Sequence, residues 1–259
     1  MKISVCLDAL CPKLDAPQAV RLLAAKGVKC VEFWGWKHRD LPALAAACKE
    51  TGVAVAGICT TCFELTRPEK RQEFLDGVRE SIAAAKSIGC KMLITQGGAD
   101  TGAPRAEQAA SILEGLRAAA PLLEDAGVTL ALEPLNRRVD HRDAYLESSQ
   151  EAFALVHAVN SPCVKVLFDI YHQQVSEGDI LGRLLPELDA VCHLHAAAVP
   201  GRAALLGGEL DYPVLLARIA AAGYRGCVGL EYFPKQFTQE GLAADLEEVR
   251  HALRGAGLE

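Results

Sequence analysis

Segments with two different periodicities alternate along this chain, and this alternation limits the fold more than any other feature. Short, mostly apolar segments are typical of strands that are covered on both faces, as in a parallel sheet. They lie at residues 2–8, 29–35, 53–61, 91–98, 128–136, 164–172, 190–198 and 226–234. Helical patterns lie between them, as at residues 17–27, 41–52, 71–89, 106–127 and 212–224. Each of these helical patterns has a glycine at or next to its end, where a helix terminator is expected.

Eight such units predict a closed (β/α)8 barrel, a TIM barrel, which we expect to form a single domain over residues 1–259. An open, doubly wound sheet is the alternative, and it usually carries a glycine-rich phosphate-binding turn after its first strand. The corresponding stretch, residues 6–15, reads CLDALCPKLD and has no glycine. Gly97 and Gly98 form a two-glycine loop, which is too little to indicate a phosphate site. We therefore expect the barrel.

Charge and hydropathy exclude some partners. The chain has 259 residues, a formal net charge of -6 and no cluster of Lys and Arg. Because phosphate binding needs a concentrated basic surface, we expect no nucleic acid partner. No apolar run has the length of a bilayer span, so we expect no membrane association and a cytoplasmic location. The ten cysteines are scattered and fit small buried apolar side chains. Only Cys59 and Cys62 have the spacing of a redox or zinc pair, and no second pair completes a zinc site.

Four of the predicted strands end in side chains that bind metal ions. Glu133, Asp169, His195 and Glu231 stand at or near the ends of the last four strands. Consecutive strands of a barrel are neighbours, and active sites lie at their carboxyl ends, so the four side chains should converge. One such acid alone is more simply a cap of the following helix. Four together predict a site for one divalent ion, with Mn²⁺, Mg²⁺ or Co²⁺ favoured over zinc because three ligands are carboxylates.

This donor set suits proton transfer next to a carbonyl. A divalent ion polarises a carbonyl, acidifies the adjacent C–H and stabilises the enediolate that forms when the proton leaves. Glu133 and Glu231 can act both as ligands and as the two proton shuttles if each keeps one oxygen free. The expected reaction is an isomerisation or epimerisation of a small sugar or keto acid.

Other residues complete the expected pocket. His172 can hydrogen-bond a substrate oxygen, and Arg202 offers a fixed positive fork to a substrate carboxylate. Glu209, in the same loop as Arg202, can orient that arginine or a ligand, and Trp34 can form a wall. The simpler alternatives are that Arg202 is a surface residue paired with Glu209 and that Trp34 packs against a helix.

Three further histidines are expected to have no role in the chemistry. His193 is two residues from His195 on the same strand face, and we expect it to be a hydrogen-bonded core residue. His38 and His141 lie in polar loops and are expected to be solvated.

Several motifs, taken in order, resemble a known group. The strings EPLN, FDIYHQQ, HLHAAAVPGR, GGELDY and GYRGCVGLEYFP resemble the sugar and sugar phosphate isomerases and epimerases that share the xylose isomerase-like barrel. The resemblance is greatest to the hydroxypyruvate isomerase branch and is dense over residues 130–234. It implies Glu133, Asp169, His195 and Glu231 as metal ligands, with Glu133 and Glu231 transferring protons. It also implies substrate binding by His172 and Arg202, and barrels of this type commonly form homo-oligomers.

The resemblance leaves several reactions open. Hydroxypyruvate isomerases often have glutamine at the position of His195, whereas ketose 3-epimerases have histidine there. Isomerisation of hydroxypyruvate to tartronate semialdehyde is the leading expectation, and ketose 3-epimerisation or dehydration of an inosose or dehydroshikimate is the alternative. Apurinic-site endonucleases share the superfamily but need further histidines, and the ends of strands two to four here offer Trp34, Thr60 and Gln96. A non-catalytic subunit of a larger complex is the most remote alternative.

Overall fold

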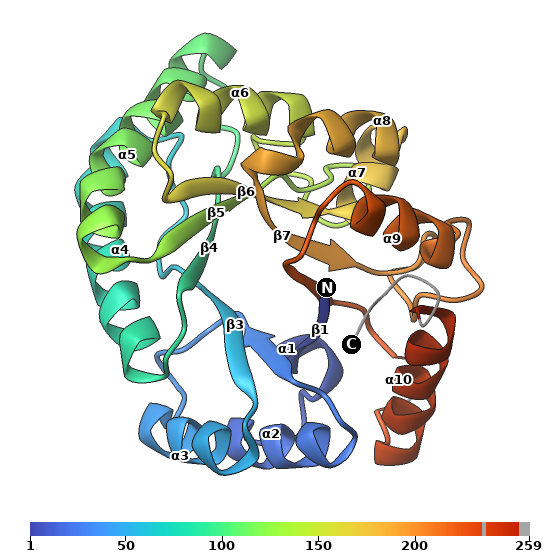
Figure 1. The fold of residues 1–259 in the computed structure, drawn as a ribbon. Coiled ribbons are helices and arrows are strands. Elements are labelled where there is room, and N and C mark those ends of the chain that lie inside the picture. The colour runs from blue at the N-terminus through green and yellow to red at the C-terminus, as the bar shows by residue number, and fades with distance from the viewer. Residues whose placement is uncertain (235–236, 254–259) are drawn as a thin grey trace.

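The computed structural model describes residues 1–234 and 237–253. Its strands form a closed parallel barrel in chain order, in which the first strand also pairs with the last (Figure 1). The strands are β1 (Lys2–Cys6), β2 (Cys30–Phe33), β3 (Ala54–Cys59), β4 (Met92–Gln96), β5 (Thr129–Glu133), β6 (Val164–Asp169), β7 (Val191–Ala196) and β8 (Cys227–Leu230). The predicted TIM barrel is confirmed. Of the predicted single domain 1–259, residues 235–236 and 254–259 lie outside the described residues.

Helices surround the barrel on its outer side (Figure 1). They are α1 (Leu7–Leu10), α2 (Ala16–Ala25), α3 (Leu41–Thr51), α4 (Arg71–Ser87), α5 (Arg105–Ala126), α6 (Ser149–Val159), α7 (Ile170–Ser176), α8 (Ile180–Leu184), α9 (Tyr212–Ala221) and α10 (Gln239–Leu253). Short 3₁₀ turns add Pro68–Lys70 and Leu185–Ala190. In the described part of the chain, no helix combines the length and the apolar character needed to span a membrane.

All eight predicted strand segments extend past the carboxyl end of the observed strand, and residues 164–172 are an example with a clear cause. Residues 164–172 were expected to be extended, but the strand stops at Asp169 and α7 begins at the next residue. The cause is local, because the Asp169 carboxylate accepts the backbone N–H groups of Tyr171, at 2.8 Å, and His172, at 3.2 Å. Such an N-cap satisfies donors that the first helical turn leaves free. The turn brings His172 back over the end of the strand.

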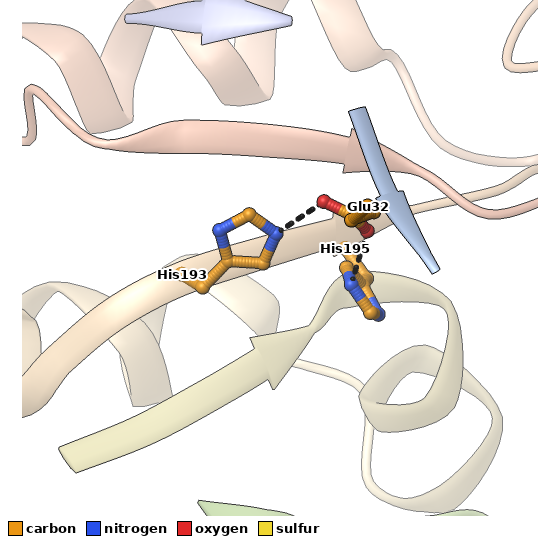
Figure 2. A group of neighbouring side chains, drawn as sticks. All are labelled: Glu32, His193 and His195. Carbon is orange, nitrogen blue, oxygen red and sulfur yellow. Dashed lines mark hydrogen bonds and ion pairs between the residues drawn. The ribbon is translucent and has the colours of Figure 1, made fainter. Parts of the chain in front are cut away.

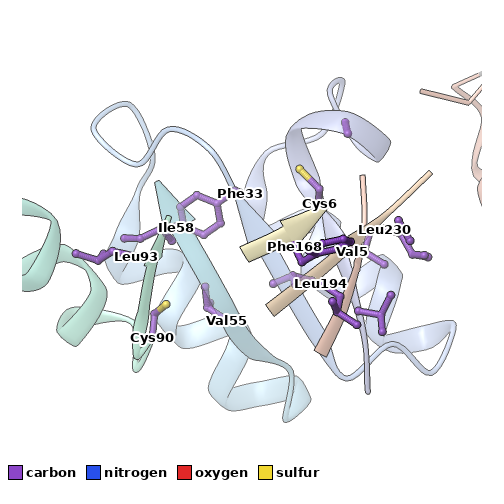
Figure 3. Close-up of a cluster of buried hydrophobic side chains, with 14 of the residues drawn as sticks. Val5, Cys6, Phe33, Val55, Ile58, Cys90, Leu93, Phe168, Leu194 and Leu230 are labelled. Atoms are coloured by element: carbon purple, nitrogen blue, oxygen red, sulfur yellow. The ribbon is translucent and has the colours of Figure 1, made fainter. Parts of the chain in front are cut away.

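Two separate apolar clusters show which strand face points inward. The larger one contains strand residues such as Leu132 and Phe168 together with helix residues such as Leu23 and Phe74, so it fills the layer between sheet and helices. Figure 3 shows some of its strand residues, among them Phe168 and Leu194. The smaller one consists of Cys59, Met92, Ile94, Ala131 and Leu167. Because side chains alternate along a strand, these residues occupy the barrel interior. Full burial of each large apolar side chain contributes about 1.5–3 kcal/mol.

Tyr212 anchors the chain where it leaves β7. Its hydroxyl donates to the carbonyl oxygen of Ala197 at 2.7 Å and accepts the Ala197 N–H at 3.2 Å. Both residues are fully buried, at 0% and 1% exposed. One side chain at the start of α9 therefore satisfies both polar groups of a buried peptide.

We expect Tyr212→Phe to lower the free energy of unfolding by about 1–3 kcal/mol, because both groups of Ala197 lose their partner without gaining water. Chemical denaturation followed by circular dichroism measures this loss. The control is Tyr232→Phe, which removes one 3.2 Å bond to the half-buried Asp245 and should cost less, because that carboxylate can turn to water. Equal losses in the two variants would contradict the assignment.

Candidate metal centre and active site

The inward face of the last four strands carries the four predicted ligands. Glu133 is two residues beyond Ala131, and Asp169 is two residues beyond Leu167, so both side chains point into the barrel. His195 and Glu231 occupy the same face at the ends of β7 and β8. All four are buried, with at most 5% of the residue exposed. The barrel register therefore brings the four strand ends to one place.

The distances around His195 define the centre. Its Nδ1 lies 3.3 Å from Oε1 of Glu133, 3.5 Å from Oε2 of Glu231 and 4.0 Å from Oδ2 of Asp169. The structure thus brings the four predicted ligands together. Three carboxylates around one imidazole nitrogen, all almost wholly buried, form a strongly negative centre that needs a positive group.

Among the atoms of this centre that have no hydrogen bond within the described residues, two lie where the four ligands meet. They are Oε1 of Glu133 and Nδ1 of His195, both buried. An unpartnered buried acceptor is costly unless something else contacts it. A cation with oxygen and nitrogen ligands would satisfy both, so the donor set fits a divalent ion and these buried residues could bind one.

His172 lies against the same centre and competes with His195 as a ligand. Glu133, Asp169, His172 and Glu231 also offer ligand atoms within 4.8 Å of one another. However, Nδ1 of His172 accepts the Asn136 side-chain amide at 2.6 Å and its backbone N–H at 3.3 Å. The proton of a neutral ring then sits on Nε2, which lies 3.6 Å from Oδ2 of Asp169 and has no hydrogen-bond partner among the described residues.

The orientation of the Asn136 amide is determined by its other contacts. Its Oδ1 accepts the backbone N–H groups of Val139 and Asp140, so its NH₂ group faces His172. Burial lowers the pKa of His172 to about 4, although the charges of Glu133 and Glu231 act in the opposite direction. His172 is therefore a neutral ring whose Nε2–H can donate to a ligand, and His195 supplies the free lone pair.

Glu231 is held from both sides. Trp34 Nε1 donates to its Oε1 at 2.5 Å, and Arg202 forms a short ion pair with its Oε2. Burial alone would raise the pKa of Glu231, but His195, Arg202 and the Trp34 hydrogen bond outweigh it and bring the pKa to about 2. The carboxylate is thus ionised and fixed in position. Trp34, predicted as a pocket wall, lines the pocket and also orients this glutamate.

Arg202 comes from the loop after β7 and is buried, with 9% exposed. Its backbone has φ of 49°, a left-handed conformation that non-glycine residues rarely adopt. The guanidinium lies between the rings of Tyr171, at 5.3 Å, and Phe233, at 5.5 Å. The expected alternative of a surface pair with Glu209 is wrong: Glu209 is exposed, and its Oε1 accepts from Gln174.

A pocket of about 700 Å³ opens above the centre, and Glu133, His172, His195, Arg202 and Glu231 contribute to its lining. Its lining also includes aromatic residues and two further histidines: Trp34, Trp36, His38, Phe63, His141 and Phe233. His141, which was expected to be solvated, lies with its ring centroid 5.3 Å from that of His172. That expectation missed the role of the loop after β5 as part of the pocket wall.

Glu32 lies inside the barrel and was not recognised from the sequence. Its carboxylate contacts His193 at 2.9 Å and the Nε2 of His195 at 2.7 Å (Figure 2). Burial would raise the pKa of Glu32, but the two imidazoles outweigh it and hold the pKa well below its usual range. His193 is a buried, hydrogen-bonded residue, as expected. The signal in the sequence is the string VEFW, in which Glu32 is a charged residue within an otherwise apolar predicted strand.

Charge balance connects the whole centre. Burial raises the pKa of Asp169, partly offset by His195 and Arg202. Burial lowers the pKa of His195, but Glu231 and Glu32 reverse this and raise it well above the usual value. In the absence of a metal ion, His195 therefore takes a proton and serves as a positive charge among the carboxylates.

Comparison with known proteins places this geometry in a family. The model of the xylose isomerase-like TIM barrel matches residues 20–254. A Homo sapiens protein provisionally named hydroxypyruvate isomerase is 32% identical over 259 residues, 94% of this chain and 93% of its own length. The hydroxypyruvate isomerase of Escherichia coli is 32% identical over 204 residues, 78% of this chain and 74% of its own.

The solved structures include one that aligns over nearly the whole chain. It is the crystal structure of a Brucella melitensis protein described as an AP endonuclease of family 2, with 29% identity and a TM-score of 0.89. The alignment covers 95% of this chain and 98% of that one. The chain therefore belongs to the xylose isomerase-like TIM-barrel family, and its sequence relatives place it with the hydroxypyruvate isomerases.

Proposed function

We propose that this protein is a divalent-metal-dependent isomerase of small hydroxy-carbonyl compounds, with hydroxypyruvate, converted reversibly to tartronate semialdehyde, as its leading substrate. The observation that carries the proposal is the meeting of three buried carboxylates with Nδ1 of His195 at the floor of the pocket. Membership of the hydroxypyruvate isomerase family supports the reaction class.

Glu133, Asp169, His195 and Glu231 would hold the ion. Their oxygen-rich donor set favours Mn²⁺, Mg²⁺ or Co²⁺. A divalent ion bound there would supply Lewis-acid polarisation of the substrate carbonyl and offset the negative charge that develops beside it. Arg202 and the Trp34 N–H keep Glu231 ionised and in one orientation, which prepares the site before substrate arrives.

The two glutamates would move the proton. In hydroxypyruvate a proton leaves C3, and its electron pair forms a C2=C3 double bond while the carbonyl π electrons move to O2, which gives an enediolate. A proton then returns at C2, and the hydroxyl proton passes from O3 to O2. Glu133 comes from β5 and Glu231 from the end of β8, so the two carboxylates reach the centre from different strands. One of the two would take the proton from C3 and the other would deliver a proton to C2, each through an oxygen that does not bind the ion.

His172 and Arg202 would bind the substrate, and the neutral His172 offers its Nε2–H to a substrate oxygen. Arg202 can accept a substrate carboxylate while its ion pair with Glu231 keeps the guanidinium in the pocket. Glu209 remains a proposed substrate contact only if its loop closes over the pocket, since it is exposed and lies outside the pocket lining.

Phosphodiester cleavage is less well supported. At the ends of β2, β3 and β4, the side chains that line the pocket are Trp34, Thr60 and Gln96. A nuclease centre with several metal ions would need metal ligands such as histidine at these positions. The net charge of -6 also disfavours a DNA surface. Ketose 3-epimerisation begins with the same proton abstraction.

We expect Asp169→Asn and Glu133→Gln each to weaken Mn²⁺ binding by at least about 100-fold, because each removes a charged ligand from a buried site. Electron paramagnetic resonance of free Mn²⁺ measures the affinity. The control is Glu177→Gln, which changes a carboxylate bonded to Ser148, Ser149 and Arg183 away from the pocket. If all three variants bind Mn²⁺ as tightly as the wild type, the centre is not a metal site.

The proton-transfer step predicts that hydroxypyruvate gains deuterium when the metal-loaded protein turns it over in D₂O. We expect Glu133→Gln and Glu231→Gln to slow this exchange by about 10²–10⁴-fold, the usual contribution of a positioned acid or base. Proton NMR of the substrate follows the exchange, and circular dichroism confirms folding. Full exchange in both variants would exclude the two glutamates as shuttles.

For Arg202 we expect Arg202→Met to raise KM for hydroxypyruvate by about 10–100-fold, which corresponds to one lost charge-assisted bond of about 1.5–3 kcal/mol. The neutral ketone dihydroxyacetone serves as the comparison, because it has no carboxylate. A rise in KM confined to hydroxypyruvate indicates carboxylate binding. An equal fall in kcat for both compounds, with KM unchanged, would mean that Arg202 serves only to hold Glu231.

A further inference from the structure

Glu32 is a buried carboxylate that the proposed reaction does not use. It lies in β2 between Val31 and Phe33, whose side chains belong to the outer apolar layer, and it is only 2% exposed. Its side chain enters the barrel and reaches the two histidines of β7 on the far side of the interior (Figure 2). Because an isolated buried carboxylate is strongly destabilising, its position calls for a specific partner.

The two oxygens of Glu32 are shared between two imidazoles. Its Oε2 lies 2.9 Å from Nε2 of His193, and its Oε1 lies 2.7 Å from Nε2 of His195. The His195 ring therefore has Glu32 on one nitrogen and the ligand carboxylates on the other. A carboxylate this close keeps the proton on Nε2 and leaves the lone pair of Nδ1 for a metal ion.

The barrel leaves room for this contact at Gly229. This glycine pairs with His195 in the register of β7 and β8. A Cβ atom there would lie 2.3 Å from Oε1 of Glu32 and 2.7 Å from Cδ2 of His195. Any side chain at this position would push the carboxylate and the imidazole apart. The absence of a side chain is therefore a condition for the contact.

The same three residues could instead be a second metal site, since Glu32, His193 and His195 offer ligand atoms within 4.8 Å of one another. Two features favour the first interpretation. Each residue is at most 2% exposed, whereas the upper centre faces the pocket. Each oxygen of Glu32 also lies in direct contact with one imidazole nitrogen, Oε2 in a hydrogen bond to His193 and Oε1 at 2.7 Å from His195.

We propose that Glu32 is a positioning residue that orients His195, with Nδ1 toward the metal centre, and that His193 braces Glu32 from the other side. This inference rests on the metal site of the proposed function. It does not depend on which compound is isomerised.

The first test measures metal affinity and imidazole protonation in Glu32→Gln, which keeps the shape of the side chain and removes its charge. We expect Mn²⁺ affinity to fall by about 10–100-fold, the usual effect of losing a partner behind a metal-binding histidine. In the Zn²⁺-loaded protein, long-range ¹H–¹⁵N spectra should show His195 protonated on Nε2 alone. In Glu32→Gln the Nε2–H proton should move to lower chemical shift, because it loses its carboxylate acceptor. The His195 signals are those absent from His195→Gln.

Gly229→Ala is the second variant, and it disturbs the same contact without removing a polar group. It should also weaken Mn²⁺ binding and alter the His195 signals, so the proposal stays testable if Glu32→Gln does not fold. Its control is Gly57→Ala, another glycine of a barrel strand, where the new Cβ would meet the flexible end of Met92. Glu177→Gln is the matched control for the change of glutamate to glutamine.

The outcomes separate this inference from the proposed function. Unchanged affinity and unchanged His195 signals in Glu32→Gln and Gly229→Ala would overturn the role of Glu32 alone. Two bound ions per chain, one of them lost with Glu32, would overturn it in favour of a second metal site. A wild-type protein that binds no ion would overturn both proposals. Normal metal binding without deuterium exchange would remove only the reaction.

Discussion

The site is organised by the burial of negative charge. Glu133, Asp169 and Glu231 lie within 4.0 Å of one imidazole nitrogen, and each is almost wholly removed from water. Buried charges of like sign are stable only when positive groups and hydrogen bonds compensate them. His195 and Arg202 supply part of this compensation, and the pocket-facing centre leaves space for a divalent ion to supply the rest. The other features of the barrel mouth serve to hold these charges at fixed distances.

Three local contacts fix the positions of the side chains at the strand ends. Asp169 caps α7 with one oxygen and faces the centre with the other, so the helix turn places His172 beside it. The Asn136 amide determines which nitrogen of His172 carries the proton. The loop after β7 folds Arg202 back onto Glu231. Each of these three contacts uses backbone groups or loop residues next to a strand. The position of the pocket side chains is therefore set outside the barrel strands themselves.

Much of this arrangement could be predicted from strand ends. The pattern of apolar segments places Glu133, Asp169, His195 and Glu231 at the same edge of a barrel, and the structure brings them together. The prediction failed where contacts depend on loops: His141 lies against His172, and Glu209 turns away from Arg202. Loop direction depends on many weak interactions between distant segments, which no periodicity reports.

The sequence by itself determined the eightfold βα repeat, the barrel and the acidic strand ends, because strand and helix periods and the parity of side chains are local properties of the chain. Only the tertiary structure decided which nitrogen of His172 and of His195 faces the centre. It also decided that Arg202 and Trp34 bind the carboxylate of Glu231. It alone also showed that Glu32 meets β7 across the space left by Gly229. Those contacts join residues up to 197 positions apart, so they exist only once the barrel has closed.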